Sequence, residues 1–368
     1  MTWLWAIPAV LQVGLAAWVA LRLRRPAPSL PAPGRVPAPA RPSDVVCLVA
    51  ARNEALTIGA CLDALAAQTL PLRVVVIDDA SSDGTGEEVR SRANAFGGRL
   101  TLIQGGPGKA LALQAGLDGT ESPVILTTDA DCRPPREWAE SMVRELGAGV
   151  LGGCTTVQGR SALAALEALD WAILLGVSAA ASEAGHPVTA MGNNMALRRD
   201  AVEAIGGFTA VAGSVTEDYE AFRRIAATRE ARLVMKAELV NRTESAGTLA
   251  AVFRQRKRWA AGALSAGSMR NALVLGGALA AHLGAFAVLA LAPLWGAGII
   301  MARWGGQLAV AAAASRRMRV DLPLSWIPIH DLLMAAYTLL TPLSLLLFGV
   351  GKWKDRTAAD LRTHSDGA

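Results

Sequence analysis

The chain has 368 residues, of which 52% are hydrophobic and only 18% are charged, and its mean hydropathy is +0.33. This composition argues against an ordinary soluble protein and favours a membrane protein with a soluble part. The net charge of +5 is compatible with nucleic acid, phosphate-rich ligands or an anionic lipid surface. The four cysteines form no CxxC pair and the four histidines are dispersed, which excludes a zinc ribbon or a disulfide framework.

Residues Thr2–Leu21 form an uncharged apolar run that is long enough to span a bilayer. Three arginines follow within 22–25, so the positive-inside rule predicts a transmembrane helix over 1–24 with a cytoplasmic segment after it. A cleaved signal peptide is the alternative, disfavoured because cations follow the apolar run instead of preceding it. Residues 25–43 hold seven prolines in nineteen positions and predict an extended linker, with a PxxP ligand as the rarer alternative.

From residue 44 to about 242, strand-like and helix-like segments alternate. Strands are predicted at 45–51, 73–78, 100–103, 123–129 and 150–157, and helices at 54–68, 84–95 and 109–117. The strands are continuous apolar runs, which is typical of a parallel sheet covered by helices on both faces. Ligands of such sheets bind at the carboxyl ends of the strands.

Beyond residue 270 the chain becomes almost wholly apolar. Residues 271–314 contain one charge, Arg303, and Pro293 near the middle, which predicts two spans in a tight hairpin. A cationic loop at 316–319 separates them from a third apolar stretch at 322–350. Polar or ionisable groups among these segments are functional candidates, namely Arg303, His330, Asp331 and Tyr337.

The charge rule does not fit three simple spans in this region. After a cytoplasmic domain, three spans would place the closing cations at 352–356 outside, although such a cluster favours the inside. We therefore expect the last stretch to be re-entrant or split near Pro342, or one segment to lie in the membrane interface.

Acidic pairs follow two of the predicted strands. Asp78 and Asp79 open the turn DDASSDGT, where a carboxylate can accept from a nucleoside base or a ribose hydroxyl. The alternative is a turn in which Asp79 and Ser81 cap the next helix. Asp129 and Asp131 follow the fourth strand as DAD, and two carboxylates there can bind a divalent cation that holds phosphates.

Two further motifs lie between and after these strands. GGPGK at 105–109 precedes a predicted helix, and Lys109 can neutralise a phosphate, but the segment lacks Walker spacing. TED at 216–218 precedes an amphipathic pattern, where Thr216 is either an N-cap or part of a functional motif.

The segment RQRKRW at 254–259 concentrates four cations and a tryptophan just before the apolar region. An amphipathic interfacial helix is predicted over 248–270. On it Gln255, Arg258 and Trp259 share one face. The other cations, Arg254, Arg256 and Lys257, point elsewhere, where anionic lipid head groups suit them.

Taken in order, DDASSDGT, GK, DAD, GNNMALRR with GGF, TED and QRKRW resemble the motifs of the family-2 inverting glycosyltransferases of GT-A fold. The resemblance is to the membrane-bound branch with a QxxRW motif, which includes cellulose, chitin and hyaluronan synthases and many bacterial lipid glycosyltransferases. ARNEALTIGACLDAL at 51–65 and KWKDR at 352–356 are also similar to that family.

The resemblance implies an α/β fold class, with a cytoplasmic GT-A domain over 44–247 that holds a Rossmann-like, mixed and mainly parallel sheet. It further implies an interfacial helix over 248–270, two to four transmembrane helices over 271–351 and a polar tail over 352–368. The expected location is a bacterial-type inner (plasma) membrane, with several spans and the catalytic domain in the cytoplasm.

The resemblance also implies roles for individual residues. Asp218 is expected to be the catalytic base, and Asp131 with Asp129 to bind Mg²⁺ or Mn²⁺. The set expected to bind the nucleotide and donor is Ala50, Arg52, Glu54, Asp78, Asp79, Lys109, Asp129, Gln255, Arg258 and Trp259, with Asp79 at the uracil. The set expected near the acceptor is Gly192, Asn193, Asn194, Glu217 and Trp259.

The expected function is metal-assisted single displacement from a nucleotide-sugar, a UDP-sugar, to a hydroxyl of a membrane lipid. A processive polysaccharide synthase is the first alternative. The third reading, a non-catalytic scaffold or nucleic-acid binder, is disfavoured because few aromatics lie among the basic residues and the acidic set is intact. The apolar helical stretch 161–185 is either core or lies at the membrane, where a lipid acceptor would present its head group.

Overall fold

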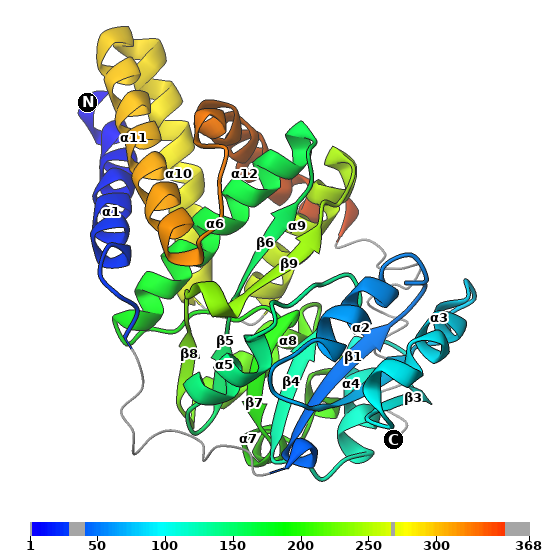
Figure 1. Ribbon diagram of the computed structural model, residues 1–368. Helices are drawn as coiled ribbons and strands as arrows, with labels where there is room; N and C mark the ends of the chain where they lie inside the picture. The colour runs from blue at the N-terminus through cyan, green and yellow to red at the C-terminus, as the bar shows by residue number, and fades with distance from the viewer. Residues whose placement is uncertain (1, 29–40, 266–268, 350–368) are drawn as a thin grey trace. The chain divides into compact units, whose positions relative to one another are not determined.

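The computed structural model describes residues 2–28, 41–265 and 269–349 (Figure 1). They form two compact units. The α/β unit contains Ala27–Thr156 and Ser182–Glu244, and the helical unit contains Met1–Pro26, Val157–Ala181 and Ser245–Gly351. Most of the predicted linker, and all of the predicted polar tail with its closing cations, lie outside the described residues.

The α/β unit is built on a seven-stranded sheet in the order β3-β2-β1-β4-β7-β5-β8. Strands β1 to β4 run parallel, β5 is parallel to β8, and β7 is antiparallel to both of its neighbours. The expected α/β fold with a mixed, mainly parallel sheet is confirmed. The strands are β1 Val45–Ala51, β2 Arg73–Asp78, β3 Leu100–Gln104, β4 Val124–Thr128, β5 Val150–Gly152, β7 Asn194–Arg198 and β8 Ala231–Leu233.

The prediction of a single strand at 150–157 is wrong, because this segment forms two strands. After β5 the chain leaves the large sheet and forms β6 (Cys154–Gln158), which pairs with β9 (Val240–Glu244) in a second sheet. The break falls at Gly153, where an added Cβ would lie 2.6 Å from both Asn194 Oδ1 and the carbonyl oxygen of Leu239. A glycine is therefore required at this close approach.

Helices cover both faces of the large sheet (Figure 1). Along β1, Val45, Cys47 and Val49 pack on one face, and Val46 and Leu48 pack on the other. This alternation explains why the predicted strand is a continuous apolar run. The first face is covered by α2 (Ile58–Ala66), α3 (Thr85–Ser91) and α5 (Trp138–Glu145); the second is covered by α4 (Lys109–Asp118), α7 (Arg199–Ala204) and α8 (Glu217–Ala226).

The helix predicted at 54–68 begins only at Ile58. The main-chain N–H groups of Asn53, Glu54 and Ala55 donate to the side chains of Ser81, Thr85 and Asp83, which hold this segment as a turn against the chain after β2. The next predicted helix, 84–95, ends at Ser91 and continues as a short 3-10 turn.

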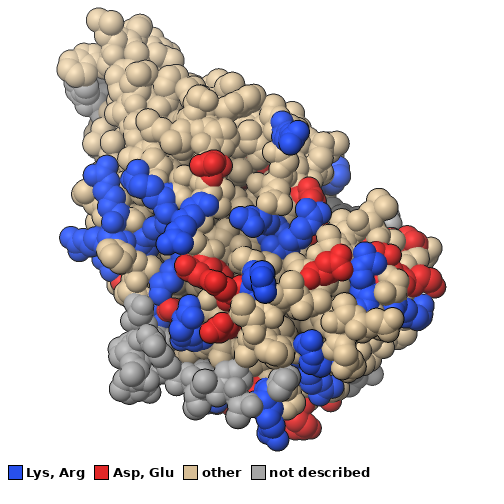
Figure 2. Space-filling view, in the orientation of Figure 1, with Lys and Arg blue, Asp and Glu red and all other residues tan. Residues whose placement is uncertain are grey.

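The helical unit contains α1 (Ile7–Leu23), α6 (Ala162–Glu183), α9 (Leu249–Ser265), α10 (Met269–Leu291), α11 (Pro293–Met318) and α12 (Ile327–Phe348). Four described segments are long and apolar enough to cross a membrane: Leu4–Leu23, Ala162–Glu183, Ala272–Leu291 and Leu324–Phe348. In α6 61% of the apolar window is buried, against 17–28% in the others, so α6 is an interior helix of this unit. Figure 2 shows almost no charged side chain on the visible surface of α10 and α11.

Three sequence expectations change in this region. α10 and α11 form the predicted hairpin, but α11 is not among the four apolar segments, because Arg303 and Gln307 lower its hydropathy. Pro342 lies inside the continuous helix α12, so the predicted split there is wrong. The predicted cationic loop is instead the last turn of α11, where Arg317 donates to the carbonyl oxygen of Leu23 at 2.8 Å.

The one charge of the hairpin is neutralised inside the helical unit. Arg303 Nη2 lies 2.8 Å from Asp331 Oδ1, and Arg303 Nη1 donates to Gln12 Oε1 on α1. Asp331 accepts further hydrogen bonds from Gln307 at 2.6 Å and from Trp304 at 3.2 Å. These buried contacts connect α1, α11 and α12 and explain how polar groups are accommodated among apolar helices.

Asn194 connects three parts of the α/β unit and is fully buried. Its Oδ1 accepts from Trp138 Nε1 at 2.8 Å, and its Nδ2 donates to the carbonyl oxygens of Cys154 and Leu239 at 2.6 and 2.9 Å. The side-chain amide is therefore hydrogen-bonded to α5, to β6 and to the segment before β9. Removing the amide would take a buried hydrogen bond from each of these three partners.

We expect Asn194→Ala to lower the free energy of unfolding by about 3 kcal/mol, because unsatisfied buried polar groups cost about 1–3 kcal/mol each. Thermal unfolding of the detergent-solubilised protein should shift down by roughly 6 °C or more. Leu56→Ala, at a fully exposed position, is the control and should change little. Equal unfolding temperatures for wild type and Asn194→Ala would contradict this assignment.

Candidate functional site

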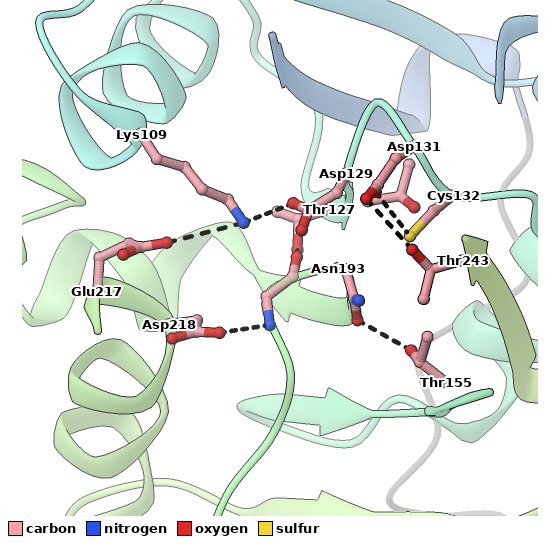
Figure 3. Close-up of polar contacts among 12 residues, drawn as sticks. Lys109, Thr127, Asp129, Asp131, Cys132, Thr155, Asn193, Glu217, Asp218 and Thr243 are labelled. Atoms are coloured by element: carbon pink, nitrogen blue, oxygen red, sulfur yellow. Dashed lines mark hydrogen bonds and ion pairs between the residues drawn. The ribbon is translucent and has the colours of Figure 1, made fainter. Parts of the chain in front are cut away.

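The carboxyl ends of β1, β2 and β4 meet at one edge of the sheet because these strands are parallel neighbours. β7 runs the other way, and its first residue, Asn194, is paired with Thr128 at the end of β4. The segment before β7 therefore reaches the same edge. Figure 3 shows the polar side chains that gather there.

Asp78 and Asp79 are both buried by their own loops. Asp78 accepts from the Ser81 N–H at 3.0 Å and from Gln104 Nε2 at 3.2 Å. Asp79 Oδ2 accepts from the Gly108 N–H at 3.0 Å, which fastens the GGPGK loop over it. In that loop, an added Cβ on Gly106 would lie 2.3 Å from Asp79 Oδ1, so only glycine fits.

The alternative in which Asp79 and Ser81 cap the next helix is wrong. The main-chain N–H of Thr85, the first residue of α3, donates instead to Asp83 Oδ1 at 3.1 Å. The turn after β2 is thus made by Asp78 and Asp83, and Asp79 is directed toward the GGPGK loop.

The predicted residues at the end of β1 lie beside Asp79. Arg52 Nη1 donates to the Asp79 carbonyl oxygen at 3.3 Å and lies 3.8 Å from its Oδ1. Ala50 is half-buried at the end of β1, and Glu54 Oε2 accepts from the Thr57 hydroxyl at 2.8 Å. The structure therefore brings together Arg52, Asp79 and the GGPGK loop.

Lys109 is the central cation of the α/β site (Figure 3). Its Nζ lies 2.5 Å from Asp129 Oδ1 and 3.7 Å from Glu217 Oε1. Burial alone would lower the pKa of Lys109, but the carboxylates of Asp129, Glu217 and Asp218 outweigh burial and raise it. The predicted DAD and TED motifs, far apart in sequence, are thus joined through one ammonium group.

Asp131 lies on the other side of Asp129, against β9. Its Oδ2 accepts from the Thr243 hydroxyl at 3.2 Å, and the Cys132 thiol lies 3.5 Å from its Oδ1. Burial, followed by the nearby charges of Asp129 and Glu54, raises the pKa of Asp131. A carboxylate in these surroundings gains stability from a cation.

Asp218 is held by two main-chain donors. Its Oδ2 accepts from the Gly192 N–H at 2.8 Å, and its Oδ1 accepts from the Tyr219 N–H at 2.8 Å. An added Cβ on Gly192 would lie 2.8 Å from the Asp218 Cβ, so the GNN segment approaches α8 closely only with glycine there. These contacts fix the direction of the carboxylate while leaving lone pairs on both oxygens.

The two asparagines of GNN have different surroundings. Asn193 Oδ1 accepts from the Thr155 hydroxyl at 2.9 Å, and its carbonyl oxygen accepts from Asn241 Nδ2 at 2.8 Å. Asn194 is a core residue whose side-chain amide is hydrogen-bonded to Trp138, Cys154 and Leu239, and its place in the acceptor region stays a prediction. Sequence reasoning missed the polar residues Thr155, Asn241 and Thr243, which lie in β6 and β9 without a motif of their own.

Gln255, Arg258 and Trp259 lie in the helical unit, on the predicted helix α9. The expectation for two of the neighbouring cations is wrong: Arg256 and Lys257 are buried, and only Arg254 is exposed. Arg256 forms an ion pair with Asp170 of α6, so it is not available to lipid head groups.

No group of three or more His, Cys, Asp or Glu side chains poised for a metal occurs within 2–28, 41–265 and 269–349. A cation at Asp129 and Asp131 would therefore need other ligands. Mg²⁺ commonly binds through one or two carboxylates and completes its shell with substrate phosphates and water.

Comparison with known proteins gives a family match for part of the α/β unit. Residues 46–206 match the family described as Glycosyl transferase family 2. The glycosyltransferase AglE of Haloferax volcanii is 28% identical over 171 residues, a match that covers 45% of this chain and 55% of that protein, so the chain spans about half the length of this relative.

A solved structure supports the fold over a longer range. The mannosyltransferase PcManGT from Pyrobaculum calidifontis, in complex with GDP-Man and Mn²⁺, has a TM-score of 0.56 at 22% identity, covering 94% of this chain and 99% of that one. The expected GT-A fold is confirmed, and residues 46–206 are similar to the family described as Glycosyl transferase family 2.

Proposed function

We propose that the protein is a membrane-bound inverting glycosyltransferase that moves a sugar from a nucleotide-sugar donor to a hydroxyl of a membrane lipid. The observation that carries the proposal is the cluster in which Lys109 lies between Asp129 and Glu217, with Asp218 held by Gly192. It combines a fixed carboxylate with charged groups suited to a diphosphate at the carboxyl edge of the sheet. A UDP-sugar is the donor that the DDASSDGT resemblance favours, whereas the Pyrobaculum neighbour binds GDP-Man.

In this mechanism Asp218 accepts the proton of the acceptor hydroxyl while the oxygen of that hydroxyl attacks the anomeric carbon of the donor sugar. The two N–H donors keep the carboxylate in one orientation during that transfer. Lys109 faces the departing diphosphate and offsets its charge. Asp79 and Arg52 bind the nucleoside, with Asp78 holding the turn that positions them.

A divalent metal, Mg²⁺ or Mn²⁺, fits the residues present. Asp131 would hold it, with Asp129 beside it, because Asp131 is a half-buried carboxylate near the acids Asp129 and Glu54. When bound, such an ion stabilises negative charge on the leaving diphosphate. The Pyrobaculum neighbour contains Mn²⁺, which supports this choice of metal.

The proposed membrane location depends on the apolar helices. We propose that α1, α10, α11 and α12 cross the bilayer, with Arg303 neutralised by Asp331 inside α11 and α12. The arginines after α1 favour a cytoplasmic α/β domain. A non-processive enzyme acting on a lipid is preferred because the apolar segments Leu4–Leu23, Ala272–Leu291 and Leu324–Phe348 contain few polar groups.

The function is tested by incubating purified protein with individual UDP- and GDP-sugars and total lipid extract. We expect one donor to yield a labelled product that partitions into organic solvent, identified by mass spectrometry. A water-soluble polymer would instead support a processive polysaccharide synthase. Absence of transfer from every donor would refute the proposal.

Asp218→Asn should reduce kcat by at least about 100-fold, since general base catalysis contributes about 10²–10⁴-fold. Nucleotide affinity should stay close to that of wild type, because Asp218 is assigned to the acceptor and not the donor. The matched control is Glu220→Gln on the same helix. In wild type the Glu220 carboxylate pairs with Arg223 and Arg224. Undiminished turnover in Asp218→Asn would rule out Asp218 as the base.

Removal of divalent ions with EDTA should abolish transfer, and added Mn²⁺ or Mg²⁺ should restore it. Asp131→Asn should raise the Mn²⁺ concentration needed for half-maximal rate by at least about 10-fold, because loss of even indirect metal contacts costs 10–100-fold. Asp63→Asn, which changes an exposed carboxylate paired with Arg92, is the control. Full activity in excess EDTA would exclude a metal-dependent reaction.

A further inference from the structure

Two acidic residues one turn apart on α6 contact α9 and the segment before it. Glu167 accepts from the Ala246 N–H at 3.2 Å and from the Ser245 hydroxyl, just before α9 begins. Asp170, three residues further along α6, forms an ion pair with Arg256 in the middle of α9. Since both carboxylates are largely buried, α6 fixes the segment before α9 through Glu167 and the middle of α9 through Asp170.

The ion pair places the Arg256 guanidinium over an aromatic pair. Its carbon atom lies 4.2 Å from the centroid of the Trp259 ring and 5.8 Å from that of Trp171, the residue after Asp170. The two indole rings meet edge to face, with centroids 5.3 Å apart and an angle of 73° between their planes. Trp259 is therefore held by a cation and by a second ring, both fixed by α6.

Helix α12 completes this arrangement from the other side of α9. His330 Nε2 lies 3.8 Å from Asp170 Oδ1, and the Tyr337 hydroxyl donates to the Arg256 carbonyl oxygen at 2.7 Å. Asp170 and Trp259 thus restrict the position of the Arg256 side chain, and Tyr337 restricts the position of its main chain. A buried arginine used in this way differs from one that attracts lipid head groups.

We propose that Asp170 is a positioning residue for Trp259: through Arg256 it fixes the tryptophan of the QxxRW motif in one orientation. The inference rests on the proposed function and on the expectation, from the QxxRW resemblance, that Trp259 binds at the diphosphate and acceptor. Asp170 itself contacts no substrate in this scheme. Its loss should slow turnover at saturating donor more than it weakens donor binding, because a misplaced group lowers the rate of the positioned step.

The test compares Asp170→Asn with the double variant Asp170→Asn/Arg256→Gln. The single variant leaves a buried arginine unpaired and is expected to unfold at lower temperature. The double variant removes both charges together and should regain much of the wild-type unfolding temperature. If Asp170 acts through Arg256 and Trp259, the folded double variant still shows a kcat about 100-fold below wild type, with donor KM little changed.

Circular dichroism supplies a readout that does not depend on activity. The close Trp171–Trp259 pair should give an exciton couplet, which Trp171→Phe identifies by difference. We expect the couplet to be lost in the double variant and kept in two controls. The first control is Glu183→Gln, at the far end of α6, which should keep wild-type turnover. The second is Asp218→Asn, which should lose turnover but keep the couplet.

A double variant that folds and turns over like wild type would overturn the proposal, and so would one that keeps the couplet. Failure of the proposed function is distinguishable, because wild-type protein would then transfer no sugar from any donor. The couplet would still report whether Asp170 and Arg256 fix Trp259.

Discussion

The carboxyl edge of the parallel strands is the constraint on which the site of the α/β unit depends. Because β1, β2 and β4 are neighbours that run the same way, the loops after them must emerge together. The antiparallel strand β7 adds the GNN segment to the same edge, since its first residue pairs with Thr128 at the end of β4. Residues that are distant in sequence, such as Gly192 and Asp218, are therefore brought into hydrogen-bond contact by the topology of the sheet.

The charge at that edge is unbalanced, and this imbalance suits a charged substrate. Asp129, Asp131, Glu217 and Asp218 provide four carboxylates, while Lys109 provides the ammonium that contacts two of them. Burial increases the strength of each charge–charge interaction because the surroundings screen less than water does. The same burial makes the uncompensated acids costly. A site of this kind would gain stability from a bound cation.

Sequence alone predicted the strands at 45–51 and 73–78 to the residue, because both are apolar runs bounded by polar turns. It also predicted that the acidic motifs end strands. It failed where three-dimensional contacts decide: a close approach at Gly153 splits one predicted strand, and neighbouring loops delay the start of α2. The burial of Asn194 could not be predicted, because an asparagine beside a motif looks the same whether it faces a ligand or fills the core.

Charges inside the helical unit show why hydropathy alone misreads such segments. Arg303 and Asp331 lie on different helices, as do Asp170 and Arg256, so neither pair is visible as a local pattern. A buried ion pair adds little net stability, because desolvation opposes the attraction, but an unpaired charge among apolar helices is expensive. Any packing that separates α11 from α12, or α6 from α9, would create such a charge. The pairs therefore act less as sources of stability than as restrictions on which helices can be neighbours.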